Sequence, residues 1–145
     1  MTLLESITRD GRLHALIIRA GYHREGIEFF TPPELSQQLG YMNRPQGHVI
    51  APHVHNHLVR EVSLTSEVLL VRSGKVRVDF YDDAHAYLES RVLAAGDTIL
   101  LAAGGHGFEM IEPSELIEIK QGPHAGDADK TVFAPVASDR IRLPD

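Results

Sequence analysis

The chain has 145 residues, a formal net charge of −6, a pI of about 5.8 and no cysteine. This length fits one domain that can fold without disulfides, and the lack of cysteine excludes disulfide frameworks, thiolate metal sites and cysteine nucleophiles. No run of Lys or Arg forms a basic patch, so we expect no nucleic-acid partner. The unusual feature is nine histidines, because histidine is the commonest metal ligand.

Two features predict a cytoplasmic protein without membrane contact. The first residues, Met1 to Asp10, are polar and mixed in charge, which does not match a signal peptide. The longest uncharged apolar stretch, near Thr98–Ala103, is far too short to cross a bilayer.

The first third of the chain predicts two strands and one short helix. Arg12–Arg19 and Gly26–Phe30 are apolar and β-branched enough for strands. Thr31 then suits a helix cap, and a proline follows at the first helical position. We therefore expect a helix over Pro32–Leu39, packed on the outside of a sheet.

After Gly40 the pattern changes to short strands separated by turn residues. Lys75–Tyr81 alternates between an apolar face and a polar face, as a half-buried strand does. The other expected strands are Gly47–His57, Glu67–Arg72, Tyr87–Leu93, Thr98–Ala102, His106–Ile111 and Glu115–Gln121. Many short strands with turns between them predict an all-β sandwich or barrel.

We expect one domain over residues 1–145. Residues 1–46 would supply N-terminal strands and the short helix, and residues 47–121 would form the barrel. Residues 122–145 would form a C-terminal arm, in which Val132–Val136 is a short apolar piece that lies on the barrel.

The segment Gly47–His57 carries the pattern with the most chemistry. His53 and His55 are two residues apart, so in a strand their imidazoles project from the same face and can hold one metal ion. His57 continues the alternation. By itself this pattern equally fits a polar strand face in solvent. His14, His23, His85 and His124 are scattered, and we expect them at the surface.

The residues around this pair resemble the two motifs of the cupin family. The first motif matches Gly47, His53, His55, Glu67 and Gly74. The second matches Gly96, the turn Ala103-Gly104-Gly105 and His106. The gap before Glu67 is longer than the family's, alanine replaces the proline of the second motif, and His106 falls about one residue early.

The resemblance implies a fold and a site. The fold would be a cupin double-stranded β-helix, or jelly-roll, barrel. The site would be a single divalent metal held by His53, His55, Glu67 and His106, with Glu61 as a rival to Glu67. Such a donor set suits Fe, Mn, Ni, Co, Cu or Zn, and the sequence does not choose among them. His57 and Tyr41 are candidate proton-transfer groups.

Three functions follow from these expectations. The first is a metal-dependent enzyme acting on a small polar metabolite, as an oxygenase, isomerase or lyase. The second is a metal-independent nucleotide-sugar isomerase or epimerase, because some small cupins use barrel histidines as acid and base groups. The third is a non-catalytic small-ligand binder or sensor.

Two strands predict a homodimer. Glu67–Arg72 and Thr98–Ala102 are apolar on both faces, so something must cover their outer side. The chain's own N-terminal strand, helix or Val132–Val136 segment could do so, but each is short. A second copy using the same patch is the preferred cover.

Overall fold

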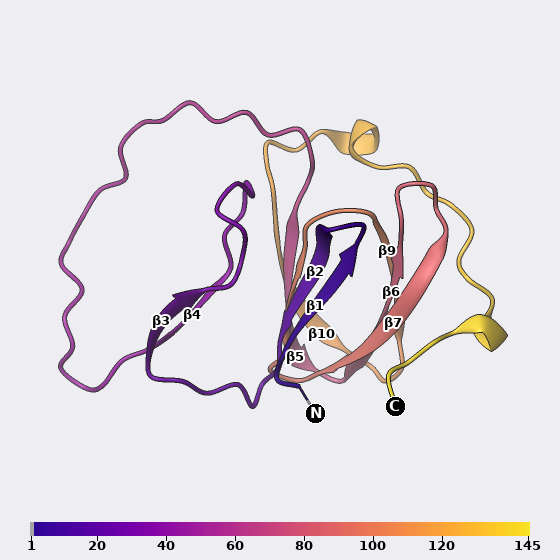
Figure 1. Cartoon of the computed structure of the whole chain (residues 1–145), viewed down its shortest axis with the longest axis horizontal. Coiled ribbons are helices and arrows are strands. Elements are labelled where there is room, and N and C mark those ends of the chain that lie inside the picture. Colours follow the sequence, from indigo (N-terminus) through magenta and orange to yellow (C-terminus); the bar gives the residue numbers. More distant parts are fainter. Residues whose placement is uncertain (1) are drawn as a thin grey trace.

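The computed structural model describes residues 2–145 and is built almost entirely of β-strands (Figure 1). The all-β fold class is therefore confirmed. The strands are β1 (Leu4–Arg9), β2 (Arg12–Ile18), β3 (Gly26–Phe29), β4 (Gly40–Asn43), β5 (Glu67–Ser73), β6 (Lys75–Tyr81), β7 (Tyr87–Ala94), β8 (Thr98–Leu101), β9 (Gly105–Met110) and β10 (Glu115–Lys120). Two short 3₁₀ helices, Gly126–Asp129 and Ser138–Arg140, follow in the C-terminal segment.

Two antiparallel sheets enclose the core. The larger sheet has the order β1-β2-β8-β5-β10, and the smaller has the order β7-β6-β9. Ile17, Leu69 and Ile99 of the larger sheet pack against Val78 and Phe80 of the smaller one, and all five are buried. The apolar alternation of β6 predicted this inward face correctly.

The barrel is not closed, which corrects the expectation of a closed jelly-roll barrel. β9 is the last strand of the smaller sheet and β10 the last of the larger one, so each has an edge without a partner among the described residues. The segment Gly47–His57, expected as a barrel strand, lies in a long loop outside the sheets (Figure 1). Without a neighbouring strand its backbone has no ladder of hydrogen bonds to join.

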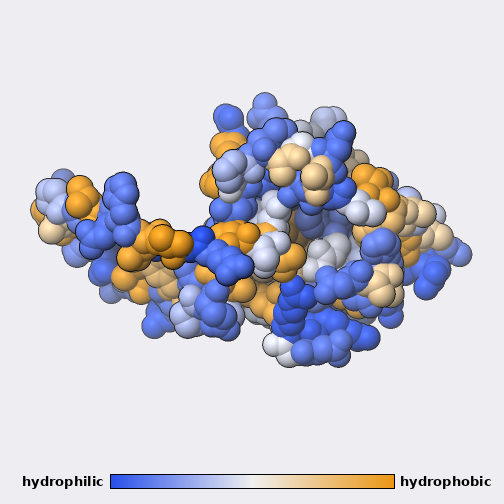
Figure 2. Space-filling model, turned by 90° about the horizontal axis from the view of Figure 1, so that it is seen from above, coloured by the Kyte–Doolittle hydropathy of each residue, from blue (hydrophilic) through white to orange (hydrophobic). Residues whose placement is uncertain are grey.

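This long loop, residues 44–66, joins β4 to β5 and contains no strand. Every residue from Arg44 to Leu64 is exposed. The loop follows the hairpin β3–β4, and the two together project away from the sheets (Figures 1 and 2).

The helix expected over Pro32–Leu39 does not form, and the segment folds as irregular turns. Thr31 still accepts a hydrogen bond from the backbone N–H of Leu39, at 3.2 Å. The amide of Gln38 donates to the carbonyls of Pro32 and Leu35, both at 2.9 Å. A helix this short pays the full cost of nucleation, and here side chains satisfy backbone groups instead.

The irregular segment covers the outer face of the larger sheet. Phe30, Leu35 and Leu39 pack against a buried cluster that includes Leu16 and Leu100. The chain therefore covers Leu100 itself, where we had expected a second copy. Ile99 and Leu101 face the core between the sheets. The homodimer remains a prediction.

Two strands were missed by the sequence patterns. β1 pairs with β2 through a turn at Asp10-Gly11, where both residues have positive φ, 51° and 75°. Asp-Gly is a known signal for such tight hairpins. β4 is only four residues long and pairs with β3. No described helix is long and apolar enough to cross a membrane.

The C-terminal segment lies on the smaller sheet, and Val132–Val136 within it is not a strand. The Phe133 ring stacks on His85, with centroids 4.1 Å apart, and meets Tyr81 edge-on at 5.0 Å. The hydroxyl of Tyr81 accepts a hydrogen bond from the backbone N–H of Val136 at 3.0 Å. Aromatic contacts rather than a strand ladder hold this segment.

Candidate functional site

Glu67 and His106 meet at one end of the gap between the sheets. Glu67 is the first residue of β5 in the larger sheet, and His106 is the second residue of β9 in the smaller sheet. The Glu67 Oε2 and His106 Nε2 atoms are 3.2 Å apart. Both side chains are largely buried, at 17% and 28% exposure.

Both residues face the core because of their strand register. His106 is paired with Phe80 of β6, and Glu67 with Leu101 of β8, and both partners are buried core residues. Paired residues of antiparallel strands project from the same face of the sheet. The six-residue spacing from Glu67 to Gly74 therefore selected a carboxylate on the core face of β5.

The contact lowers the pKa of the Glu67 carboxyl below its usual range. The hydrogen bond from His106 is the largest cause, and the positive charge of Lys120 acts in the same direction. Burial opposes the shift because it disfavours the charged form. The carboxylate is thus held ionised.

Polar side chains that the sequence patterns did not select surround this pair. Lys120 of β10 is the register partner of Glu67, and its ammonium lies 3.5 Å from the Asp129 carboxylate. Thr65 donates a hydrogen bond to Asp129, and this bond is the main reason that the pKa of Asp129 is lowered. The alternation of β10 places Lys120 on the same sheet face as Glu67, and this pattern could have identified Lys120 from the sequence. Asp129 lies in a 3₁₀ turn without periodicity and gave none.

His53 and His55 lie in the long loop, and the structure does not bring them to Glu67 and His106. Their rings meet edge-on, with centroids 5.3 Å apart. The His53 Nδ1 atom lies 2.9 Å from the Ala51 carbonyl oxygen, and both histidines are exposed. Within residues 2–145, no three His, Asp or Glu side chains are close enough together to hold a metal ion.

The other candidates also lie apart from the Glu67–His106 pair. Glu61 and His57 are exposed in the long loop. Tyr41 is in β4, where its ring meets Tyr22 edge-on at 5.0 Å. Of the two carboxylate candidates, only Glu67 contacts a histidine in the described chain.

One histidine expected at the surface is buried. His14 is 5% exposed, and its Nδ1 atom has no hydrogen-bond partner in the described structure. It packs under Gly104, where an added Cβ would lie 2.6 Å from that nitrogen. This contact explains a glycine at position 104 by packing, without a ligand.

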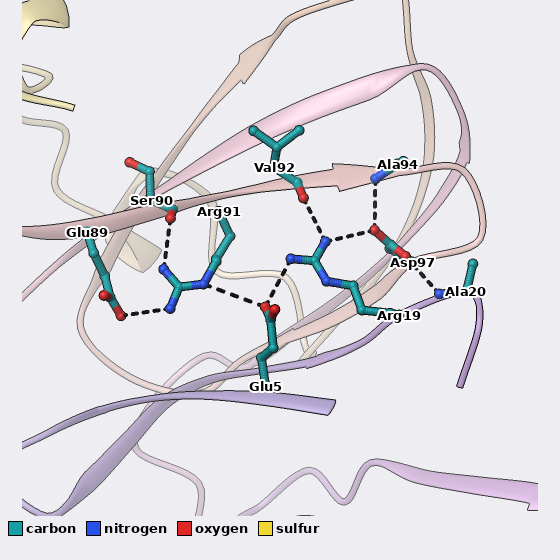
Figure 3. Close-up of polar contacts among 9 residues, drawn as sticks. All are labelled: Glu5, Arg19, Ala20, Glu89, Ser90, Arg91, Val92, Ala94 and Asp97. Carbon is teal, nitrogen blue, oxygen red and sulfur yellow. Dashed lines mark hydrogen bonds and ion pairs between the residues drawn. The ribbon is translucent and has the colours of Figure 1, made fainter. Parts of the chain in front are cut away.

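A second polar cluster joins four segments of the chain (Figure 3). Arg19 binds Asp97 at 3.0 Å and Glu5 at 2.9 Å, and Arg91 lies 3.6 Å from Glu5. Asp97 also accepts hydrogen bonds from the backbone N–H groups of Ala20 and Ala94. Since each acid is already satisfied by an arginine or an N–H group, this cluster is structural.

Comparison of the chain with protein-family models, with curated proteins and with solved structures finds no match.

Proposed function

We propose that the chain is a cupin-like protein in which Glu67 and His106 form half of a site for one divalent metal, and that this site serves an enzyme acting on a small polar metabolite. The observation that supports it most is the 3.2 Å contact between these two side chains across the gap between the sheets. Two residues selected by the motif spacing, far apart in the chain, thus lie side by side.

The chemistry of the pair fits a metal. A carboxylate held ionised and an imidazole are both ligands of Fe, Mn, Ni, Co, Cu and Zn. His53 and His55 would supply the remaining imidazoles. When bound there, a divalent ion would act as a Lewis acid on a substrate oxygen or lower the pKa of a bound water.

Two further side chains, Phe108 and Lys120, lie near the Glu67–His106 pair. Phe108 lies beside His106, with ring centroids 5.4 Å apart, and gives the site an apolar wall. Lys120 places a positive charge near Glu67. Since Lys120 is already paired with Asp129 at 3.5 Å, its charge supports the ionised Glu67 carboxylate rather than a substrate group.

A second function is favoured by the same contact. A carboxylate that accepts a hydrogen bond from an imidazole orients that imidazole for proton transfer, so Glu67 and His106 could act as an acid–base pair without metal. Such a pair would suit a metal-independent nucleotide-sugar isomerase or epimerase, the second function that the cupin resemblance implies. An activity that survives exhaustive chelation would favour this second function.

Metal titration of purified variants tests the first function. We expect the wild type to bind one divalent ion, and Glu67→Gln and His106→Ala each to lower its affinity by at least about tenfold. Glu25→Gln and His23→Ala are the matched controls, because these exposed side chains lie between β2 and β3, outside the long loop and the Glu67–His106 pair. Unchanged affinity in both Glu67→Gln and His106→Ala would contradict the proposal.

A further inference from the structure

The free edge of β9 exposes side chains that belong to the core. Phe108 and Met110 are paired with Val78 and Val76, so they project from the core face of the smaller sheet. Val76 and Val78 are completely buried, yet Phe108 is 37% and Met110 51% exposed. The edge of β9 is unpaired, and its core-facing apolar side chains are exposed. Both features indicate that one more strand can pair there.

The long loop has the composition of that strand. Its apolar side chains are exposed, with Val49 at 80%, Val54 at 86% and Leu58 at 66%. Between residues 44 and 65 of the described chain, one backbone hydrogen bond occurs, from the N–H of His48 to the carbonyl of Pro45. The segment therefore has its backbone groups available for pairing.

The residues of this segment fit the edge position. Pro52 has no N–H to donate, so it is tolerated only where one side of the strand is left unpaired, as in an added edge strand. With His53 and His55 on the core face, Val54 projects from the opposite face. Directly opposite side chains of paired strands lie about 4.5–5.5 Å apart at Cβ and diagonal ones about 7–8 Å, so a register with His53 or His55 opposite His106 would bring both imidazoles to its side.

The hairpin that precedes the loop points to another copy of the chain. Its connecting segment, residues 30–39, packs on its own larger sheet through Phe30, Leu35 and Leu39. From there the hairpin β3–β4 projects away from that sheet, and apolar residues lie along the projection (Figures 1 and 2). Ile27, Phe29 and Met42 are about half exposed on it, at 47%, 59% and 48%.

The sheets carry a matching apolar surface. Leu70 of β5 and Ile117 of β10 are register partners on the outer face, at 37% and 44% exposure, and Ile119 beside them is 58% exposed. Because the hairpin points away from its own sheets, it is free to pack on those of a second copy, and each copy has both a projecting apolar hairpin and an apolar surface that could receive one. In a twofold dimer, the hairpin of each copy would pack on the apolar surface of the other, so both contacts form at once.

We propose that two copies exchange these segments, so that residues 48–57 of one copy pair with the edge of β9 in the other. Each metal site then takes His53 and His55 from one chain and Glu67 and His106 from its partner. This inference rests on the proposed metal site, and it adds that the site is incomplete in a single chain.

Complementation between two inactive variants tests the exchange. One variant carries His53→Ala and His55→Ala, and the other carries Glu67→Gln and His106→Ala. Neither has a complete set of ligands in any assembly of its own. When the two are co-refolded, exchange produces mixed dimers in which one site has all four native ligands.

The expected readout is Zn²⁺ binding in about a quarter of the sites. Random assortment makes about half of the dimers mixed, and each mixed dimer holds one complete site of two. The control is co-refolding of His53→Ala with His55→Ala, which restores no complete pair on the loop. Light scattering of the wild type should give the mass of two chains of 16.1 kDa.

The outcomes separate the two proposals. If the wild type binds no divalent metal, the proposed function fails, whereas a dimeric mass would still support the exchange of segments. If the wild type binds metal and the mixture of the two double variants restores none, the metal site stands and the exchange is overturned. A wild-type mass of one chain likewise overturns the exchange.

Discussion

At the scale of single residues, two neighbours lower the pKa of the Asp129 carboxyl. The Thr65 hydroxyl donates a hydrogen bond to it, and Lys120 adds a positive charge 3.5 Å away. Both favour the ionised form, so the pKa of Asp129 in the folded chain lies below its ordinary value.

We predict that Thr65→Val raises the pKa of Asp129 toward that of a free aspartate. A lowered pKa contributes stability above the unfolded pKa of about 3.9, and this stability is lost as the pH falls through the folded value. The difference in unfolding free energy between wild type and variant should therefore shrink on acidification. Carboxyl NMR titration measures the shift, and the exposed Asp127 provides the internal control. An unmoved Asp129 titration would contradict this prediction.

Gly74 and Gly47 separate two reasons for a glycine. Both have positive φ, at 84° and 83°. A Cβ at Gly47 would meet nothing within 4 Å, whereas one at Gly74 would overlap the carbonyl oxygen of Pro113 and lie 2.8 Å from the Ser114 Cα. Both glycines thus have the same backbone conformation, but Gly47 lies in open space and Gly74 lies against another segment of backbone.

We predict that Gly47→Ala costs about 1 kcal/mol of unfolding free energy, from the left-handed conformation alone. Gly74→Ala should cost about 1–3 kcal/mol more, because the β5–β6 turn and the residues before β10 must move apart. Urea denaturation of both variants gives the comparison. Equal destabilisation would show that the approach to Pro113 is unimportant.

At the scale of elements, the arginine cluster connects strands that are not all neighbours in one sheet. Arg19 follows β2, Glu5 lies in β1, and Asp97 precedes β8 in the larger sheet. Arg19 also donates to the carbonyl of Val92 in β7 of the smaller sheet, at 2.6 Å. One guanidinium therefore joins the two sheets at this end of the fold (Figure 3).

We predict that Asp97→Ala destabilises the fold by about 3 kcal/mol, because it removes one acceptor of a buried arginine and leaves the backbone N–H groups of Ala20 and Ala94 without theirs. The Asp97 and Arg19 side chains are 7% and 11% exposed. Asp83→Ala is the matched control, since its pair with Arg12 is exposed and should contribute less than about 1 kcal/mol. Thermal unfolding followed by circular dichroism measures both, and similar losses would contradict a special role for Asp97.

The sequence predicted elements well where periodicity and turn residues agreed. β6 was predicted with its bounds and its buried face, because its alternation is undisturbed and a glycine precedes it. The helix at Pro32–Leu39 does not form, and its expected cap, Thr31, bonds to other groups. Thr31 and Gln38 bond to each other and to the backbone of an irregular segment.

The candidate site was predictable only in part, for a related reason. Spacing and strand direction placed Glu67 and His106 on core faces, and their contact follows from sheet pairing. The same reasoning placed His53 and His55 in a strand. A strand forms only beside a partner strand, and the local sequence does not tell whether that partner lies in the same chain or in another copy. Lys120 and Asp129 entered the site through tertiary neighbours rather than motifs.

At the scale of the whole molecule, the exposed long loop and the unpaired edges of β9 and β10 bear on how copies of the chain would assemble. The outer face at Leu100 needs no second copy, because Phe30, Leu35 and Leu39 cover it. The apolar surface that remains open is at Leu70, Ile117 and Ile119, with Phe108 and Met110 at the edge of β9. If the chain forms a dimer, we expect its interface at these open apolar residues rather than at the covered outer face of β8.

The position of β8 also determines when the fold can be completed during synthesis. β8 lies between β2 and β5, pairing Ala15 with Leu101 on one side and Leu69 with Ile99 on the other. The N-terminal hairpin is made early, yet its only link to the rest of the larger sheet arrives with a strand near residue 100. Until the ribosome has released β8, β2 and β5 both have an open apolar edge. A nascent chain of this protein is therefore exposed to wrong pairing for most of its synthesis, and its folding becomes cooperative only near the end.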